Sequence, residues 1–208
     1  MKLAMLTFAT RNIDYRNETA ANKRRYCKFH GYDFIDERQI IDPTRPAAWS
    51  KILLLKKYLF QYDWCWWFDC DAVITNKSIR LETFCDDGYN LVIARDRNGT
   101  NSGVYGMRDS EWSMKLLDAM WGRTDLIKDA WDHELKGRWD QKAFHALLRE
   151  QWVSEKVKVV DKKLFNCNDY DWKPGDFVFH AAGGPHGPSK MKMKAMARLI
   201  MDDVSQPV

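Results

Sequence analysis

The sequence lacks the cysteine pattern of a disulfide-stapled protein. Its five cysteines are odd in number and scattered, with no Cys-x-x-Cys pair. This usage is typical of a reducing compartment. The sequence also lacks an apolar stretch of membrane-spanning length, and its short apolar start runs into Arg11-Asn12 without a signal-peptide pattern. We therefore expect a cytoplasmic protein with no membrane span.

A strong excess of one charge is also missing. The 33 Lys and Arg against 29 Asp and Glu give a net charge of +4, and no basic run is long enough to follow a phosphate backbone. We therefore expect no nucleic-acid partner. Internal repeats and low-complexity linkers are absent as well, so the 208 residues suit one domain with a sizeable core.

What the chain does contain is an alternation of apolar runs and amphipathic stretches. We expect strands at 2–9, 32–35, 64–68, 90–94, 102–107, 156–160 and 176–180. We expect helices at 17–30, from Pro46 onward, and at 110–121, 140–151 and 190–201, with Gly31 and Ser110 as caps. This alternation predicts an α/β fold with a mostly parallel central sheet flanked by helices. The segment 64–68 is apolar throughout, which indicates a central strand buried on both faces.

An acidic pair follows this strand in Asp69-Cys70-Asp71. In an extended segment, residues two apart face the same side at about 6–7 Å, so the two carboxylates project together and Cys70 points away. Burying two unpaired carboxylates costs several kcal/mol, and a divalent cation removes that cost. Ligands of open α/β sheets also bind at the carboxyl ends of strands. The pair predicts a metal site, with two solvated carboxylates as the alternative.

The same motif is open to a different chemistry. A hydrophobic strand ending in Asp-x-Asp is also typical of haloacid-dehalogenase-type phosphatases, which would make Asp69 the nucleophile and Asp71 the general acid. However, that motif usually opens its fold, whereas here strands and helices precede it. The later Gly175-Asp176 also has no second acidic residue for a phosphatase metal site. The phosphatase stays an alternative.

Six motifs occur in an order that resembles glycosyltransferase family 34. They are Trp49-Ser50-Lys51-Ile52, Trp64-Cys65-Trp66-Trp67-Phe68-Asp69-Cys70-Asp71-Ala72, Asn101-Ser102-Gly103-Val104, Asp140-Gln141-Lys142-Ala143-Phe144, Phe165-Asn166, and Gly175-Asp176-Phe177-Val178-Phe179-His180-Ala181-Ala182-Gly183. The resemblance implies a single GT-A domain over 1–208, with a nucleotide-binding half near 1–100 and an acceptor or catalytic half near 101–208. It implies metal-dependent, retaining transfer of a hexose from a nucleoside-diphosphate sugar, UDP-linked, to a glycan hydroxyl.

The lack of a membrane anchor departs from the Golgi members of this family. It is more similar to virus-encoded enzymes of the host cytoplasm, and we expect the N-terminal domain of a longer, multidomain algal-virus enzyme. A domain that binds the nucleotide sugar without catalysis is the other reading, because it would share every binding motif.

The resemblance also implies roles for the acidic motif. Asp71 would coordinate the metal, Asp69 would contact the ribose or a metal-bound water, and His180 would be the third protein ligand. Carboxylates, one imidazole and diphosphate oxygens suit Mn²⁺, with Mg²⁺ as the second choice. Cys70 lies inside this nucleotide-sugar motif. The segment that would hold the base and ribose is Thr7-Phe8-Ala9-Thr10-Arg11.

Phosphate contacts are expected from three other places. Lys51 either reaches a phosphate or lies on a solvated helix face. Backbone amides at Gly183 and Gly184 either approach phosphate oxygens or belong to an ordinary loop, and Lys190 lies near them in sequence.

Asp140 and Gln141 begin a helix, so their side chains lie near its positive end. By resemblance Gln141 lies near the anomeric carbon, where front-face substitution needs only a group that stabilises an oxocarbenium-like centre. A double displacement needs a carboxylate, for which Asp140 is the candidate, and Asp140 is otherwise a helix cap. Asn101 and Asp96 are expected to contact hydroxyls of the donor sugar.

Overall fold

A six-stranded sheet forms the centre of the molecule, and the computed structural model describes residues 1–10, 12–39, 41–127, 139–182 and 187–199. Its strands are β1 (Leu3–Phe8), β2 (Asp33–Glu37), β3 (Trp64–Phe68), β5 (Leu91–Asp96), β6 (Gly99–Arg108) and β7 (Val157–Asp161), in the order β2-β1-β3-β6-β5-β7. Of these six strands, only β6 runs against its neighbours. The mostly parallel sheet is therefore confirmed.

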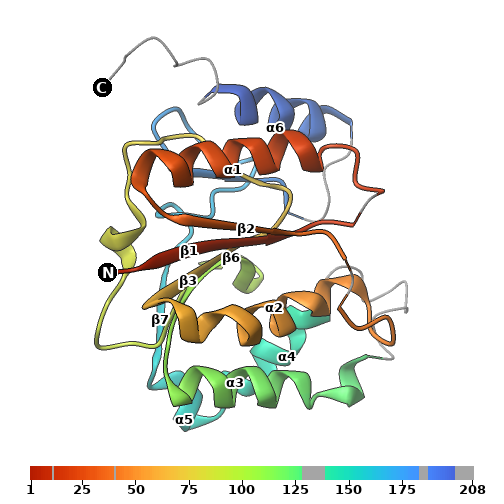
Figure 1. Cartoon of the computed structure of the whole chain (residues 1–208), viewed down its shortest axis with the longest axis vertical. Helices are drawn as coiled ribbons and strands as arrows, with labels where there is room; N and C mark the ends of the chain where they lie inside the picture. The colour runs from red at the N-terminus through yellow and green to blue at the C-terminus, as the bar shows by residue number, and fades with distance from the viewer. Residues whose placement is uncertain (11, 40, 128–138, 183–186, 200–208) are drawn as a thin grey trace.

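Helices cover both faces of this sheet (Figure 1). One face carries α1 (Arg16–His30) and α6 (Gly187–Leu199), and the other carries α2 (Ser50–Tyr58), α3 (Glu111–Trp121), α4 (Trp139–Leu147) and α5 (Gln151–Ser154). Short 3-10 helices are η1 (Ala47–Trp49), η2 (Leu59–Gln61), η3 (Leu81–Phe84) and η4 (Thr124–Leu126). Within the described ranges, no helix combines the length and the apolarity needed to cross a membrane.

Local signals in the sequence set two of the helix ends. Gly31 takes the left-handed conformation (φ 74°) and ends α1, and the Ser110 side chain accepts a hydrogen bond from the backbone N–H of Ser113 at the start of α3. The prediction of a single helix at 140–151 is wrong. Glu150 is extended (φ −84°, ψ 133°), which separates α4 from α5.

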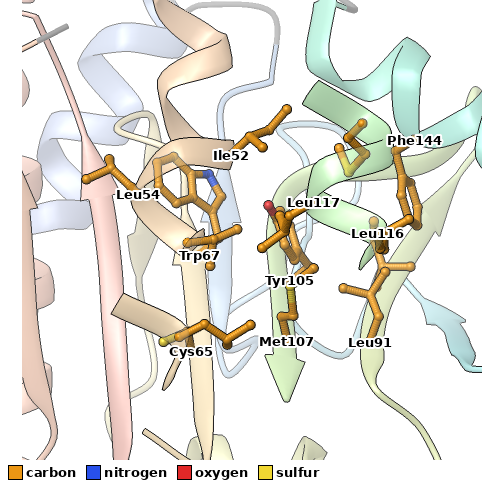
Figure 2. Close-up of a cluster of buried hydrophobic side chains, with 14 of the residues drawn as sticks. Ile52, Leu54, Cys65, Trp67, Leu91, Tyr105, Met107, Leu116, Leu117 and Phe144 are labelled. Atoms are coloured by element: carbon orange, nitrogen blue, oxygen red, sulfur yellow. The ribbon is translucent and has the colours of Figure 1, made fainter. Parts of the chain in front are cut away.

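Strand β3 is buried on both faces, as its uniform apolarity predicts. Cys65 and Trp67 pack with α2, α3 and α4 (Figure 2), and Trp64, Trp66 and Phe68 pack toward α1. Burying each large apolar side chain stabilises the fold by roughly 1.5–3 kcal/mol. The bulk of Trp66 also explains a glycine on β6, because a Cβ at Gly106 would lie 2.7 Å from the indole ring.

A second, two-stranded sheet lies beside the first. The sequence predicted a strand at 176–180 but not the strand with which it pairs. This second sheet pairs β4 (Ala72–Ile74) with β8 (Val178–His180) in antiparallel register, with Ala72 opposite His180. Only the last three residues of the expected strand 176–180 are extended in this way, since Gly175 (φ 99°) turns the chain just before it. This pairing brings His180 to the acidic motif.

Candidate active site

A cavity of about 640 Å³ opens at the carboxyl ends of β1 and β3. Its wall combines the end of β1, the start of α2, the acidic motif after β3, the β5–β6 turn, the start of α4 and the end of β8. These segments are far apart in the sequence and converge only through the sheet order. The position agrees with the rule that open α/β sheets bind ligands beyond the carboxyl ends of their strands.

The acidic motif is held by backbone hydrogen bonds on three sides. Asp69 N–H donates to the carbonyl of Gly103 (2.7 Å), Ala72 N–H donates to the carbonyl of Asp69 (3.1 Å), and Ala181 N–H donates to the carbonyl of Asp71 (3.0 Å). The motif is therefore a tight turn between β3 and β4 rather than an extended segment. The turn still directs both carboxylates into the cavity, and Cys70, whose Sγ lies 4.0 Å from the Tyr15 hydroxyl, also contributes to the cavity wall.

His180 completes a cluster with the two carboxylates. One ligand atom from each of Asp69, Asp71 and His180 lies within 4.8 Å of the other two. The Nε2 atom of His180 is 3.3 Å from Asp71 Oδ1, and its Nδ1 is 2.7 Å from the side-chain oxygen of Asn166. Oxygen and imidazole donors at this spacing suit a divalent cation such as Mn²⁺ or Mg²⁺.

Lys51 lies at the centre of a second charged cluster and is almost fully buried. Its Nζ is 3.2 Å from Asp69 Oδ1 and 2.9 Å from Asp140 Oδ2, and it donates to the carbonyl of Ser102 (3.1 Å). The indole N–H of Trp67 donates to the same Asp69 oxygen (2.7 Å). The alternative of a solvated helix face for Lys51 is therefore wrong, because its ammonium group has three partners inside the protein.

The start of α4 places two side chains against β6. The Ser102 hydroxyl donates to Asp140 Oδ2 (3.0 Å), and the Ser102 backbone N–H donates to Gln141 Oε1 (3.1 Å). Asp140 is buried, whereas the Gln141 side chain is partly exposed on the cavity wall. Both side chains therefore have fixed orientations at the cavity.

The β5–β6 turn supplies the neighbouring polar wall. Asp96 accepts hydrogen bonds from the Asn98 backbone N–H (2.6 Å) and from the Asn101 side chain (2.9 Å), while Asn101 Oδ1 accepts from the Gly103 backbone N–H (2.9 Å). These bonds order a turn that carries several hydrogen-bonding groups. Such groups suit the hydroxyls of a polar ligand.

The electrostatics of the cluster favour a cation. Desolvation raises the pKa of Asp69. The nearby Lys51 ammonium acts to lower this pKa, but the charge of Asp71 raises it further, and the net shift is upward. Burial also acts to raise the pKa of Asp71, but the adjacent His180 outweighs it and holds this pKa below its usual value. Burial lowers the pKa of His180, and the Asp71 carboxylate reverses this and raises it. The cluster therefore favours a positive charge between its ligands, which a divalent cation also supplies.

The structure brings together most of the residues singled out from the sequence. The cavity wall includes Phe8, Ala9, Thr10, Lys51, Asp69, Cys70, Asp71, Asp96, Asn101, Asp140, Gln141 and His180. Thr7 is buried in β1 beneath this wall, and Lys190 makes an ion pair with Asp14 instead of lining the cavity. Arg11, Gly183 and Gly184 lie outside the described residues.

Three contributors were missed as site residues. Ser102 connects Lys51, Asp140 and Gln141, and Asn166 contacts His180, although both stood inside the quoted motifs. Trp67 was expected only as core, yet its indole N–H reaches Asp69. The alternation along β3 could have identified Trp67, since residues 67 and 69 are two apart, whereas no local spacing connects Asn166 to His180.

Comparison with known proteins gives a consistent result. The model of the galactosyl transferase GMA12/MNN10 family matches residues 5–87 and 84–187. Probable glycosyltransferase 3 of Oryza sativa subsp. japonica is 31% identical over 175 residues, which cover 71% of this chain and 37% of the rice protein. The chain thus spans well under half the length of this curated relative.

Solved structures share the fold at low identity. A glycosyltransferase involved in the glycosylation of the major capsid of PBCV-1 superposes with a TM-score of 0.71 at 15% identity, over 96% of this chain and 100% of that one. A Drosophila β1,4-galactosyltransferase 7 in complex with manganese, UDP-Gal and xylobiose gives 0.55 at 13% identity, over 93% and 79%. These likenesses show that the fold is that of GT-A glycosyltransferases.

Proposed function

Because the chain belongs to the galactosyl transferase GMA12/MNN10 family, we propose that it is a metal-dependent, retaining glycosyltransferase. The donor is a nucleoside-diphosphate hexose, UDP-linked, and the acceptor is a glycan hydroxyl. The observation that carries this proposal is that Asp69, Asp71 and His180 line the same cavity and place their ligand atoms within 4.8 Å of one another. The same fold in the Drosophila enzyme holds manganese and UDP-Gal, which supports the proposed ligands.

The three clustered side chains fit a hard divalent cation. Two carboxylates and one imidazole leave coordination positions for diphosphate oxygens, which suits Mn²⁺ with Mg²⁺ as the second choice. When bound, the cation neutralises charge that develops on the leaving diphosphate. Asp71 and His180 would hold it directly, and Asp69 would contact it or the ribose.

The remaining wall divides the donor between two regions. The end of β1, at Phe8, Ala9 and Thr10, would hold the nucleoside, and the β5–β6 turn with Asp96 and Asn101 would hold the sugar. Lys51 contributes a fixed positive charge beside the carboxylates, because its partners keep it protonated and raise its pKa against the effect of burial. Preorganised charge of this kind stabilises a developing anion more effectively than flexible solvent.

The contacts of Asp140 and Gln141 favour front-face substitution. Asp140 Oδ2 already binds the Lys51 ammonium and the Ser102 hydroxyl and is nearly inaccessible, which makes it a poor nucleophile for a double displacement. Gln141 keeps an oxygen near the sugar region on a fixed helix start. In the proposed step the anomeric C–O bond breaks, the acceptor oxygen bonds to the same face, and its proton passes to the leaving phosphate oxygen.

Family membership also bears on the phosphatase alternative and on where the protein acts. It leaves no support for the phosphatase, and the five free thiols support our proposal of a cytoplasmic protein. The division into a nucleotide half (1–100) and a catalytic half (101–208) stays part of the proposal. So do a viral origin, which the likeness to the capsid-glycosylating enzyme supports, and a place in a longer enzyme.

Turnover separates an enzyme from a non-catalytic binding domain. The chain is incubated with UDP-galactose, UDP-glucose or UDP-xylose, with Mn²⁺ or with EDTA, and released UDP is measured. We expect slow, Mn²⁺-dependent release from at least one donor, and no such release by Asp71→Ala with an unchanged circular-dichroism spectrum. UDP release that is independent of Mn²⁺, or that Asp71→Ala retains, would contradict the proposed metal site. Absence of UDP release from every donor would favour the non-catalytic binding domain.

A further inference from the structure

We propose that Asn166 is a positioning residue that fixes which nitrogen of His180 faces the carboxylates. The side-chain oxygen of Asn166 accepts a hydrogen bond from Nδ1–H, so Nε2 is the nitrogen left to bind a divalent cation beside Asp71. This inference rests on the proposed function, because it takes His180 to be a metal ligand. It assigns a role to a buried side chain that does not line the cavity.

The contact between the two side chains is short and dry. Asn166 Oδ1 lies 2.7 Å from His180 Nδ1, and each of the two residues is only 4% exposed. A carbonyl oxygen can only accept a hydrogen bond, so the ring nitrogen facing it must carry the proton. In a neutral imidazole the other nitrogen, Nε2, is then the acceptor and the metal-binding atom.

The far side of the ring is equally constrained. Nε2 lies 3.3 Å from Asp71 Oδ1, so both ring nitrogens have a defined neighbour. Gly103 packs against the ring edge: a Cβ there would lie 2.0 Å from His180 Cε1. The ring therefore lies directly against the β6 backbone with both nitrogens engaged, and the partner of Nδ1 decides what Nε2 can do.

Asn166 is itself fixed relative to the strand that carries His180. Its backbone N–H donates to the carbonyl of Lys162 (2.8 Å), and His180 N–H donates to the carbonyl of Cys167 (2.7 Å). Cys167 also forms a bridge with Phe179 of β8. The segment that bears the asparagine is thus joined directly to the strand that bears the histidine.

The other half of the amide argues against a purely structural role. Among the described residues, Asn166 Nδ2 has no hydrogen-bond partner although it is buried. An unsatisfied buried N–H group opposes folding, and a leucine of similar size would not carry one. Stability alone therefore does not account for an asparagine here, whereas a carbonyl oxygen aimed at Nδ1 does.

Direct metal binding tests this role. Free Mn²⁺ is measured by its electron paramagnetic resonance signal, in the presence of UDP, for the wild type, Asn166→Leu, Asn166→Asp and the control Asn168→Leu. Asn168 lies two residues away, and its side chain bonds the Tyr170 backbone N–H and the Asp171 carboxylate rather than His180. We expect Asn166→Leu to bind about 10–100-fold more weakly. Asn166→Asp keeps the acceptor and should stay close to the wild type, as should Asn168→Leu.

A second readout reports the proton itself. A ¹H–¹⁵N spectrum of the histidine rings, recorded with diamagnetic Mg²⁺ and UDP, shows which nitrogen of His180 is protonated. We expect Nδ1–H in the wild type and in Asn166→Asp. Thermal melts of each variant establish that it is folded.

Several results would overturn the inference. These are an unchanged Mn²⁺ affinity in folded Asn166→Leu, an Asn166→Asp variant as weak as Asn166→Leu, or a wild-type proton on Nε2. The last result would mean that the amide presents Nδ2 to the ring. Wild-type Mn²⁺ binding together with an unaffected Asn166→Leu overturns this inference alone, whereas no Mn²⁺ binding by the wild type overturns the proposed function with it.

Discussion

Two lysines are buried on opposite faces of the sheet, Lys51 from α2 and Lys23 from α1 (Figure 1). Lys51 has two carboxylates and a carbonyl around its ammonium group. Lys23 is fully buried, and among the described residues its Nζ has no hydrogen-bond partner. The same side chain is therefore placed in two opposite environments only one sheet apart.

The difference appears in the protonation of the two groups. Burial lowers the pKa of Lys23 to about 8, although Cys70, Asp71 and Asp69 lie near enough to oppose it. Burial also acts to lower the pKa of Lys51, but Asp140 and Asp69 outweigh it and raise the pKa well above its usual value. Direct partners, rather than depth, thus decide whether a buried lysine keeps its charge. Lys51 is a fixed cation of the site, and Lys23 weakens the fold near neutral pH.

Removing the charge of Lys51 should have the largest effect. We expect Lys51→Met to lower UDP release about 10²–10³-fold, because a preorganised charge beside the diphosphate is lost. Both rate and Mn²⁺ dependence are measured with the assay for UDP release. A variant that retains wild-type turnover would show that Lys51 belongs to the fold and not to the site.

The same substitution should also destabilise the protein, by about 3–5 kcal/mol, because it leaves Asp140 buried without its ion-pair partner. The double variant Lys51→Met/Asp140→Leu removes both charges, and we expect it to recover much of that stability without recovering activity. Urea unfolding curves give the three free energies. Equal stability of the single and double variants would contradict the pairing.

Lys23→Met should stabilise the protein, whereas Lys51→Met destabilises it. Between the pKa of about 8 in the folded state and 10.5 when unfolded, the unfolded chain binds more protons, so wild-type stability rises with pH across this window. The cost of Lys23 is full below pH 8, at up to ~3 kcal/mol. The methionine variant should therefore be more stable by up to that amount at pH 7.

The pH dependence of that difference is the check. Free energies of unfolding for the wild type and Lys23→Met should approach each other as the pH rises toward 10.5, and UDP release at pH 7 should be unchanged. A stability difference of the opposite sign at pH 7 would mean that Lys23 has a stabilising partner.

The smallest effect is expected for an exposed lysine of the same helix. Lys28 is exposed on α1, so Lys28→Met should change the free energy of unfolding by no more than about 0.5 kcal/mol at any pH. This variant serves as the matched control for Lys23→Met. A Lys28→Met effect as large as that of Lys23→Met would show that helix α1 responds to charge in general and not to burial.

The two lysines also show how far the sequence alone could lead. The strand–helix alternation and the acidic pair after an apolar strand predicted the fold and the centre of the site, because both signals are local. The extended geometry predicted for the pair is wrong, because a turn brings Asp69 and Asp71 together. The fate of Lys51 stayed open, since helical spacing cannot reveal partners on β6 and α4.

The sequence contains a local signal for the burial of Lys23. Lys23 lies four residues after Thr19 and three before Tyr26, which are both buried, so the helical period places it on the inner face of α1. The contact between Asn166 and His180 has no local signal in the sequence, because it depends on how the segment after β7 returns beside β8. Such long-range placements need the structure.

Isothermal titration calorimetry of Mn²⁺ into the UDP-saturated chain tests the central claim most directly. The cluster of Asp69, Asp71 and His180 predicts saturable uptake of a single Mn²⁺ that disappears in folded Asp71→Ala. Absence of uptake by the wild type, or equal uptake by Asp71→Ala, would contradict a metal-bound nucleotide sugar in this cavity.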